Sequence, residues 1–588
     1  MSVTIDELNP YLSVVILKIA DNTFNINSLK ENLSLSRYRF KTEEYDGGNI
    51  FYSHYKEEKQ ASWTTNESVK DISNHVLIIF KFDSYLALYH SDNAKKNKIY
   101  SLIFRGPSGH EFKKLRLVRK EVFNSAFLSN VKIKNLWLNN IGNQSDVNAD
   151  TKVLSGSNLE HALDPIGDQM YNFSAIKVEN TNIDLSIGIN SSYSKLWIKK
   201  YANSTEYFDV LKIILEEIKE KDTSPNPLLH HPVSILANSH TEYTLLSQMI
   251  DIQLNSCELF SIDSEEYEIL SSISSLWDNC NFEFNLINNL YQIKILDSSN
   301  NEKIAEFRLF FSKKDECIRF NVIGSSEYDS NLLKALEHKG LVKYWFLDDQ
   351  MISNGLIYKK SYRDVIYNGF EWCDFTNYLV KKEKPIDDDF SLIGDPQDKS
   401  LFSWVKNNWN GTSLDDLVDY NQSFVKGWLL CDDGAGEKAD FIHVTDEDNP
   451  TISLIHAKGA NTNSNGRQIA PTAYEVVVSQ SIKNIRYLDK TSISETITSA
   501  PNSNVENLVW LNGVVSTRDS FKNYLDGLTQ YKKRVVILQP HVTNTKYNLN
   551  NPSDSQKLKT NLLSSLLLSA QNTVNSLGAE FVVIGDNI

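Results

Sequence analysis

The segment ADFIHVTDEDNPTISLIHAKGA, residues 439–460, contains three residues that could do chemistry together: Asp440, His456 and Lys458. Its alternation of apolar and polar residues predicts two short strands joined by an acidic turn. A carboxylate that holds a divalent cation, beside a lysine that neutralises phosphate charge or orients water, is the minimal set for metal-dependent phosphodiester cleavage. A salt-bridged pair at a strand end is the alternative interpretation.

Pairing of the apolar residues sets the register of these two strands. Ile442 should lie opposite Leu454, because a slip by one residue would separate the apolar set. This register places Asp440 opposite His456 and diagonal to Lys458, at Cβ separations of about 5 Å and about 7–8 Å. We therefore expect the three polar side chains at one end of a buried apolar face.

Neighbouring segments offer further candidates. The turn GAGE should fold the strand WLLCDD back and could bring Asp432 or Glu437 to the same end. In the predicted helix TAYEVVVSQSIKN, Glu475 fits a capping box, and Gln480 lies roughly 140° around the helix from it, so Gln480 is the better site candidate. Arg467, in the loop NTNSNGRQIAP, could reach a substrate phosphate or could simply be solvated.

The composition bounds the class of protein. A chain of 588 residues with 41% hydrophobic residues should form several globular domains. A net charge of -15 argues against indiscriminate coating of nucleic acid or acidic membrane, although a local basic groove is compatible with it. Five cysteines stand singly, without a CxxC pair, which disfavours a zinc ribbon or a disulfide scaffold.

The same features indicate a cytoplasmic protein. The first residues are acidic where a signal peptide would be basic, and no apolar run approaches the roughly 18 residues needed to cross a bilayer. No GxxxxGK[ST] or GxGxxG motif is present, so an ATPase activity in the same system should belong to a partner. We expect no membrane association.

The pattern of elements predicts a multidomain protein of the α/β and α+β classes. We expect a small α+β or mostly β module over 1–128 and a central α+β recognition or assembly region over 129–395. The stretch 380–400, rich in charge, Pro and Gly, reads as a linker. Over 400–588, helices at 400–409 and 413–424 and later strands and helices predict an α/β domain with a mixed central sheet flanked by helices.

The arrangement of a strand with Asp, a second strand ending in xK and a following helix resembles the PD-(D/E)xK, or restriction-endonuclease-like, superfamily. The runs GAGEKADFIHV, ISLIHAKGA and YEVVVSQ are similar to a subset of bacterial anti-phage defence proteins. The resemblance covers about 400–588 and is strong over 427–487. It implies a restriction-endonuclease-like fold for the C-terminal domain.

The resemblance also implies roles for individual residues. Asp440 would be the first metal ligand, Lys458 the catalytic lysine, and Gln480 the polar residue on the following helix. The second acidic ligand would stand at position 456, which is His456. Imidazole suits Mn²⁺ better than Mg²⁺, and Glu437 could supply a further oxygen.

The function implied is a nuclease that requires Mg²⁺ or Mn²⁺ and acts in anti-phage defence, with DNA favoured over RNA as substrate and a helicase or other ATPase as partner. The alternative is a non-catalytic subunit of the same fold that binds nucleic acid or scaffolds a partner. His456 favours that alternative, whereas the presence of both Asp440 and Lys458 favours the nuclease.

Overall fold

The structure is a computed structural model of the chain. It describes residues 3–588 except 28, 30–37, 62, 93–94, 97–113, 143–148, 160–161, 182–183, 199–202, 224–231, 238, 241–242, 244–245, 256–264, 289, 313–316, 325–327, 360–363, 410–425, 435 and 501–502.

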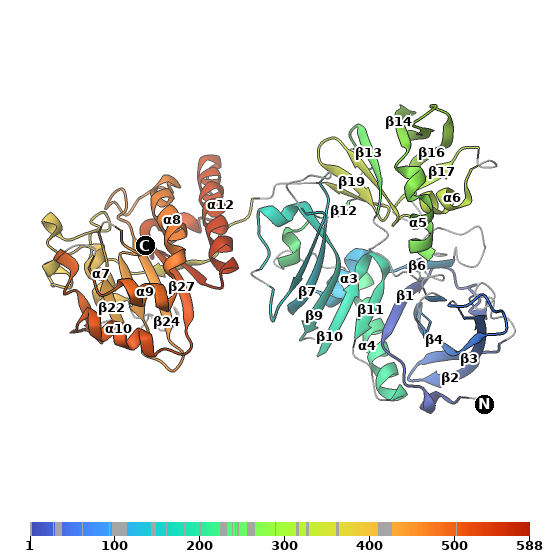
Figure 1. Cartoon of the computed structure of the whole chain (residues 1–588), viewed down its shortest axis with the longest axis horizontal. Coiled ribbons are helices and arrows are strands. Elements are labelled where there is room, and N and C mark those ends of the chain that lie inside the picture. The colour runs from blue at the N-terminus through green and yellow to red at the C-terminus, as the bar shows by residue number, and fades with distance from the viewer. Residues whose placement is uncertain are drawn as a thin grey trace. The chain divides into compact units, whose positions relative to one another are not determined.

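The chain divides into two compact units. The N-terminal unit comprises residues 1–160 and 168–361, and the C-terminal unit comprises 161–167 and 362–588. This division does not coincide with the predicted boundaries near 128 and 395. The mixed α/β, multidomain class expected from the sequence is confirmed, with several separate sheets (Figure 1).

The first sheet of the N-terminal unit is antiparallel and continues across the predicted boundary at residue 128, since its strands come from both sides of it. In spatial order its strands are β2 (Lys41–Tyr45), β3 (Gly48–Gln60), β4 (Lys70–Phe82), β5 (Tyr85–His90), β1 (Ser13–Ile19), β11 (Lys195–Ile198), β10 (Leu185–Asn190), β9 (Tyr171–Asn180), β7 (Val131–Asn140) and β8 (Thr151–Ser155), with β6 (Leu115–Leu117) beside β1. The helices α3 (Lys120–Phe127) and α4 (Ser204–Thr223) contact each other.

Two smaller antiparallel sheets complete this unit and share a hydrophobic core with two helices. One contains β12 (Ser239–His240), β20 (Leu356–Lys359), β19 (Gln350–Ser353), β18 (Val342–Phe346) and β13 (Met249–Leu254). The other contains β14 (Cys280–Ile287), β15 (Leu290–Asp297), β16 (Lys303–Ser312) and β17 (Cys317–Val322). The helices are α5 (Glu265–Trp277) and α6 (Ser330–Glu337).

The C-terminal unit is built on one mixed sheet, as the sequence predicts. Its spatial order is β21 (Phe370–Cys373), β28 (Glu580–Asp586), β27 (Lys532–Thr543), β24 (Thr451–Ala457), β23 (Phe441–Val444), β22 (Trp428–Cys431), β25 (Val509–Leu511) and β26 (Val514–Val515). The strands from β21 to β24 run parallel, and those from β24 to β26 run antiparallel. The parallel half therefore requires crossover connections, which helices provide.

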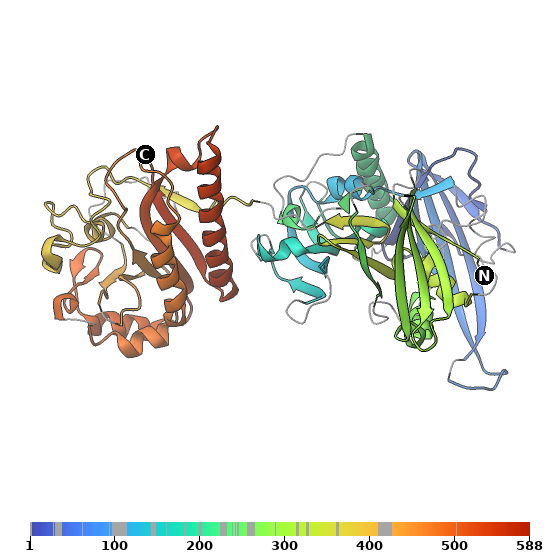
Figure 2. The same cartoon turned by 90° about the horizontal axis from the view of Figure 1, so that it is seen from above.

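Helices cover both faces of this sheet, because its central strands are apolar on both sides. The face that carries Ile452 and Leu454 packs against α8 (Thr472–Asn484), α9 (Lys490–Thr496), α10 (Arg518–Gly527) and α12 (Asp554–Ser576). The face that carries Ile455 packs against α7 (Leu401–Asn408). The short α11 (Asn544–Tyr547) follows β27. Figure 2 shows α12 alongside the sheet. No helix among the described residues is long and apolar enough to span a bilayer.

The predicted linker at 380–400 is wrong. Val380, Phe390 and Ile393 are buried in the core that also contains α7. The buried carboxylate of Asp398 accepts a hydrogen bond from Lys382 at 2.7 Å. The segment forms short 3₁₀ turns at Ile386–Asp388 and Phe390–Leu392 and belongs to the folded C-terminal unit. The predicted helix at 413–424 lies outside the described residues.

Candidate functional site

The predicted pairing of β23 with β24 is confirmed. Ile442 lies opposite Leu454, and Val444 lies opposite Ile452. Asp440 immediately precedes β23, and its carboxylate accepts a hydrogen bond of 2.7 Å from the backbone N–H of Ala457, the last residue of β24. The Asp440 side chain is thereby fixed at the end of the hairpin, with the residue only 7% exposed.

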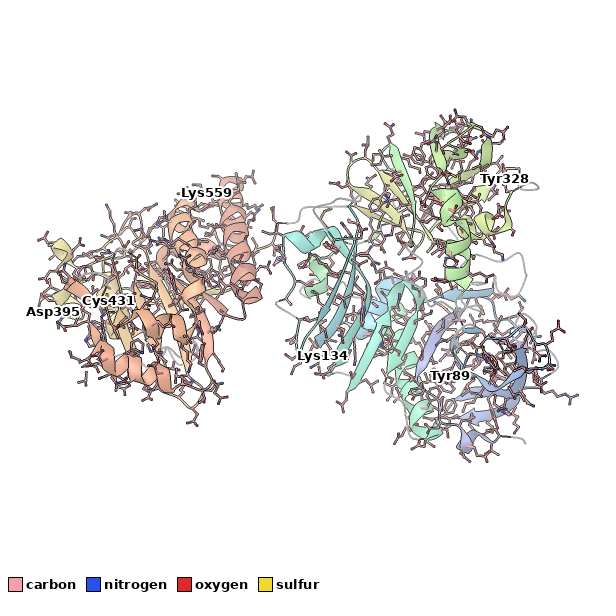
Figure 3. The ribbon with its side chains drawn as sticks, viewed as in Figure 1. Tyr89, Lys134, Tyr328, Asp395, Cys431 and Lys559 are labelled. Atoms are coloured by element: carbon pink, nitrogen blue, oxygen red, sulfur yellow. The ribbon has the colours of Figure 1, made fainter. Side chains whose placement is uncertain are left out.

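Two further carboxylates meet Asp440. Oxygen atoms of Asp433, Glu437 and Asp440 all lie within 4.8 Å of one another, and we call these three residues the Asp440 cluster. Asp433 follows β22, whose last residue is Cys431 (Figure 3). The turn between β22 and β23 reverses through Gly434 and Gly436, which have φ values of 144° and 87° that favour glycine. Glu437 accepts the N–H of Gly434 at 2.8 Å, so its side chain folds back into the turn.

The environment of the Asp440 cluster favours the protonated forms of Asp440 and Glu437. Burial, reinforced by the nearby charges of Glu437 and Asp433, raises the pKa of Asp440 well above its ordinary value, although the Ala457 N–H works in the opposite direction. Burial also raises the pKa of Glu437, with a contribution from Asp433. These carboxylates would ionise together more readily if positive charge were supplied to them.

Lys458 directly follows β24 and lies beside this cluster through Glu383. Its ammonium is 2.8 Å from a carboxylate oxygen of Glu383, and the same oxygen accepts the N–H of Gly459 at 3.2 Å. Glu383 in turn contributes to the negative field at Asp440. The side chain of Lys458 is 40% exposed, so it is accessible from solvent.

A second lysine reaches the cluster directly. The ammonium of Lys384 is 2.8 Å from an oxygen of Asp433 and lies over the rings of Phe390 and Phe402, 5.8 and 5.9 Å from their centroids. Burial acts to lower the pKa of Lys384, but the hydrogen bond to Asp433 and the charges of Asp433 and Asp440 raise it. Lys384 therefore carries its positive charge at the cluster.

His456 is in β24 as predicted, but it lies outside the set of mutually close ligand atoms. The residue is 1% exposed, and its Nε2 is buried without a hydrogen-bond partner. Burial, with a smaller contribution from Lys483, lowers the pKa of His456 to about 4. The ring is therefore neutral at physiological pH and available as an acceptor or donor.

Helix α8 approaches the cluster from one face of the sheet. The side chain of Asn484 donates to the backbone carbonyl of Glu437 at 3.4 Å, and Gln480 lies one turn earlier on the same helix face. Gln480 is half-buried, whereas Glu475 is exposed. The capping box predicted at Glu475 is not formed, because the helix begins with Pro471 in the N-cap position and no side chain caps it.

Arg467 is a structural residue in this unit and not an exposed loop arginine. It is 3% exposed, and its guanidinium donates to the carbonyls of Pro540 and His541 at 2.9 and 3.1 Å. It also pairs with the buried carboxylate of Asp586. These bonds fasten the loop after β24 to the ends of β27 and β28, so the prediction that Arg467 contacts a phosphate does not fit its position.

Of the two adjacent aspartates, the sequence favoured Asp432, but Asp433 belongs to the cluster. Asp432 is fully buried and its carboxylate pairs with Lys438 and Arg518, each at 3.2 Å. Its backbone N–H donates to the Asp440 carbonyl at 3.0 Å, and its charge contributes to the raised pKa of Glu437, but its carboxylate is not one of the three in the cluster. Asp433, Glu383 and Lys384 were not predicted. The signal for Glu383 and Lys384 is the charged run KKEK at 381–384, within the predicted linker, and the signal for Asp433 is its place beside Asp432 in the run WLLCDD.

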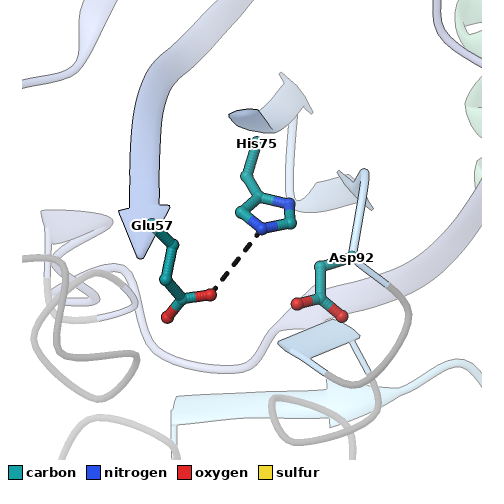
Figure 4. Close-up of side chains that lie close together, drawn as sticks. All are labelled: Glu57, His75 and Asp92. Carbon is teal, nitrogen blue, oxygen red and sulfur yellow. Dashed lines mark ion pairs between the residues drawn. The ribbon is translucent and has the colours of Figure 1, made fainter. Parts of the chain in front are cut away.

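A second group of possible ligands lies in the N-terminal unit. Atoms of Glu57, His75 and Asp92 are within 4.8 Å of one another, and we call these residues the His75 cluster (Figure 4). Glu57 pairs with Lys95 at 2.6 Å and with Lys59 at 3.3 Å, and lies 3.7 Å from His75. Burial opposes ionisation of Glu57, but the hydrogen bonds from Lys95 and Lys59 lower its pKa.

Comparison with protein-family models, with curated proteins and with solved structures found no significant match for this chain. The candidate site therefore rests on its own geometry.

Proposed function

We propose that the C-terminal unit is a nuclease domain of the PD-(D/E)xK type that requires a divalent cation. The observation that carries the proposal is the convergence of Asp433, Glu437 and Asp440 at the end of the β23–β24 hairpin, where Lys458 follows Ala457, the residue whose N–H donates to Asp440. The mixed sheet with helices on both faces supports a restriction-endonuclease-like fold for the unit.

The donor set suits Mg²⁺ or Mn²⁺. Both cations prefer oxygen ligands, and the atoms of the Asp440 cluster within 4.8 Å of one another are carboxylate oxygens. The raised pKa values of Asp440 and Glu437, caused first by burial and then by neighbouring carboxylates, indicate acids that are under-compensated by positive charge. Either a proton or a divalent cation would supply the missing charge.

Residues near the cation would contribute to orienting the water and binding the substrate. When bound, the cation would polarise the scissile phosphate and lower the pKa of a water molecule. Lys458, half-exposed and held by Glu383, would orient that water or neutralise charge on the phosphate. Gln480, on the adjacent helix face, would contact the substrate. The neutral His456 would support the hairpin from its buried position.

The substrate proposed is nucleic acid, with DNA favoured over RNA, and the setting proposed is anti-phage defence in the cytoplasm with a helicase or other ATPase as partner. These points rest on the sequence resemblance. The net charge of -15 supports a site reached through a restricted surface or a partner, since the protein as a whole repels polyphosphate.

The test is cleavage of labelled single- and double-stranded DNA and RNA by the full chain with Mg²⁺, with Mn²⁺ and with chelator. Wild type should cut only with a divalent cation, and Asp440→Asn and Lys458→Met should each lose at least about a hundredfold in rate. Lys382→Met, which removes a lysine of the same unit that pairs with Asp398, is the matched control and should keep the activity. Cleavage that survives Asp440→Asn would contradict the proposal.

A non-catalytic subunit of the same fold is the second candidate, and His456 favours it. The position at which the resemblance expects an acidic ligand holds a buried, neutral imidazole whose Nε2 has no hydrogen-bond partner. This candidate predicts nucleic-acid binding without cleavage under every cation, and binding that is unchanged in Asp440→Asn.

A further inference from the structure

Lys384 occupies an unusual place for a lysine next to a candidate cation site. Its ammonium lies 2.8 Å from Asp433, one of the three residues of the Asp440 cluster. The side chain is 31% exposed, whereas the Asp433 side chain is 6% exposed. Lys384 therefore forms an ion pair with a buried carboxylate that could also bind a cation from solvent.

The segment around Lys384 holds the ammonium there. Its charge lies over the faces of Phe390 and Phe402, which attract cations. Both rings belong to the buried core between the sheet and α7. Pro385, the next residue, is buried and precedes the 3₁₀ turn at Ile386–Asp388, so the backbone beside Lys384 is also fixed.

The charges around Lys384 show which carboxylates its ammonium compensates. Glu383, Asp433, Glu437 and Asp440 act on one another, while Lys458 is paired with Glu383. Lys384 is thus the lysine that compensates the Asp440 cluster directly, and it does so through an oxygen of Asp433.

We propose that Lys384 is an internal cation that competes with a divalent cation for Asp433 and so sets the affinity of the Asp440 cluster for metal. This inference rests on the proposed function, because it assumes that the cluster binds a divalent cation.

The physical reason is repulsion between like charges at short range. A divalent cation bound by Asp433 and Asp440 would stand within a few ångströms of the ammonium if Lys384 stayed in place, and such charges repel strongly near a protein surface. If Lys384 instead left Asp433, its ion pair and its contacts with both rings would be lost. Whether Lys384 stays or leaves, metal binding is therefore weaker than in a variant with a neutral residue at position 384.

Lys382 provides a matched control on the same segment. It pairs with Asp398 at 2.7 Å, its side chain is 28% exposed, and that of Asp398 is 2% exposed. The pair therefore resembles Lys384 with Asp433 in distance and burial. Asp398, however, bonds to Ser400 and Ser403 and is not part of the Asp440 cluster.

The experiment is calorimetric titration of the full chain with Mn²⁺, comparing wild type, Lys384→Met, Lys384→Gln and Lys382→Met. Methionine keeps much of the lysine stem's packing and removes its charge, and glutamine provides a second neutral variant should methionine disturb folding. Circular dichroism confirms that each variant is folded. We expect both Lys384 variants to bind Mn²⁺ at least about tenfold more tightly than wild type, and Lys382→Met to bind like wild type.

Equal or weaker binding by folded Lys384 variants, when wild type does bind Mn²⁺, would overturn this inference and leave the proposed function standing. The same tightening in Lys382→Met would also overturn it, because the effect would then follow from net charge and not from position. Failure of every chain to bind Mn²⁺ would overturn the proposed function and the inference together.

Discussion

The Asp440 cluster and the His75 cluster contain similar groups within the same 4.8 Å limit, yet their charges are balanced differently. In the His75 cluster, Glu57 is paired with Lys95 and Lys59, and these bonds lower its pKa against the effect of burial. In the Asp440 cluster, Asp440 is more deeply buried and its pKa is raised, first by burial and then by neighbouring carboxylates.

Proximity of possible ligands therefore does not by itself identify a cation site. Glu57 already forms ion pairs with two lysines, so a metal would have to compete with them, although its Oε2 atom makes no hydrogen bond. Around Asp440, the four carboxylates Glu383, Asp433, Glu437 and Asp440 face the two lysines Lys384 and Lys458, which leaves negative charge uncompensated when all are ionised. An excess of carboxylates over neighbouring lysines, together with the half-exposed Lys458, distinguishes the Asp440 cluster from the His75 cluster.

Asp586 is a buried carboxylate of the same unit whose charge is compensated by a buried arginine, in contrast to Asp440. It is paired with Arg467, and both side chains are almost completely buried. Arg467→Met should lower the free energy of unfolding by about 3–5 kcal/mol, since it leaves the Asp586 charge without its partner. Calorimetric unfolding of the full chain measures this, and the double variant with Asp586→Asn should recover part of the loss. A change of under about 1 kcal/mol would show that the pair is not structural.

Substitution of one carboxylate in each cluster tests whether Mn²⁺ binds at the Asp440 cluster and not at the His75 cluster. Mn²⁺ at about a hundred times its dissociation constant should stabilise the wild-type C-terminal unit by about 2.7 kcal/mol. Asp433→Asn should remove that stabilisation, whereas Glu57→Gln should leave it unchanged, because Glu57 is already paired with two lysines. Thermal unfolding with and without Mn²⁺ gives the answer, and loss of the effect in Glu57→Gln would reverse the assignment.

How far the sequence predicts this site depends on the type of signal. Pairing of Ile442 with Leu454 was predictable because alternation on two short apolar strands permits one register that keeps the apolar residues together. That register brought Asp440 to the end of β24, where it bonds to Ala457. Periodic patterns of this kind also predicted a mixed sheet flanked by helices, but they did not locate β21, α9, β25, β26 or α10.

The parts that could not be predicted have no periodic pattern. Glu383 and Lys384 lie in a charged segment whose burial depends on scattered residues such as Phe390 and Ile393, and only tertiary packing shows that these reach the core. Asp433 lies beyond the end of β22, where strand alternation no longer applies and the turn geometry decides which aspartate faces the cluster. The buried partners of Arg467 come from strands more than seventy residues away.

The dependence of stability on pH should have opposite signs at the two clusters. Because the pKa of Asp440 is raised on folding, ionising it costs stability as the pH rises above the ordinary value of about 3.9 toward its folded value. Asp440→Asn should therefore stabilise the C-terminal unit in chelator at neutral pH, and the gain should shrink as the pH falls toward the ordinary carboxyl pKa of about 4. Unfolding of wild type and Asp440→Asn between pH 4 and pH 7 measures this difference in the free energy of unfolding. A difference that grows toward low pH would contradict the prediction.

The smallest effect is expected at Glu57, whose pKa is lowered on folding by Lys95 and Lys59 in spite of burial. The stability that this pairing contributes is present above the ordinary carboxyl pKa and is lost as the pH falls through the folded value. Lys95→Met should destabilise the N-terminal unit by about 0.5–1 kcal/mol at neutral pH, because the pair is only partly buried. Denaturant unfolding at pH 7 and at low pH tests this, and an equal loss at both would contradict it.

The most direct test of the account is to locate bound Mn²⁺ by anomalous X-ray diffraction from crystals of the full chain. We predict a peak among the carboxylate oxygens of Asp433, Glu437 and Asp440 and none at Glu57, His75 and Asp92. A peak at the His75 cluster, or none at the Asp440 cluster at a saturating Mn²⁺ concentration, would contradict the claim that uncompensated buried charge marks the cation site.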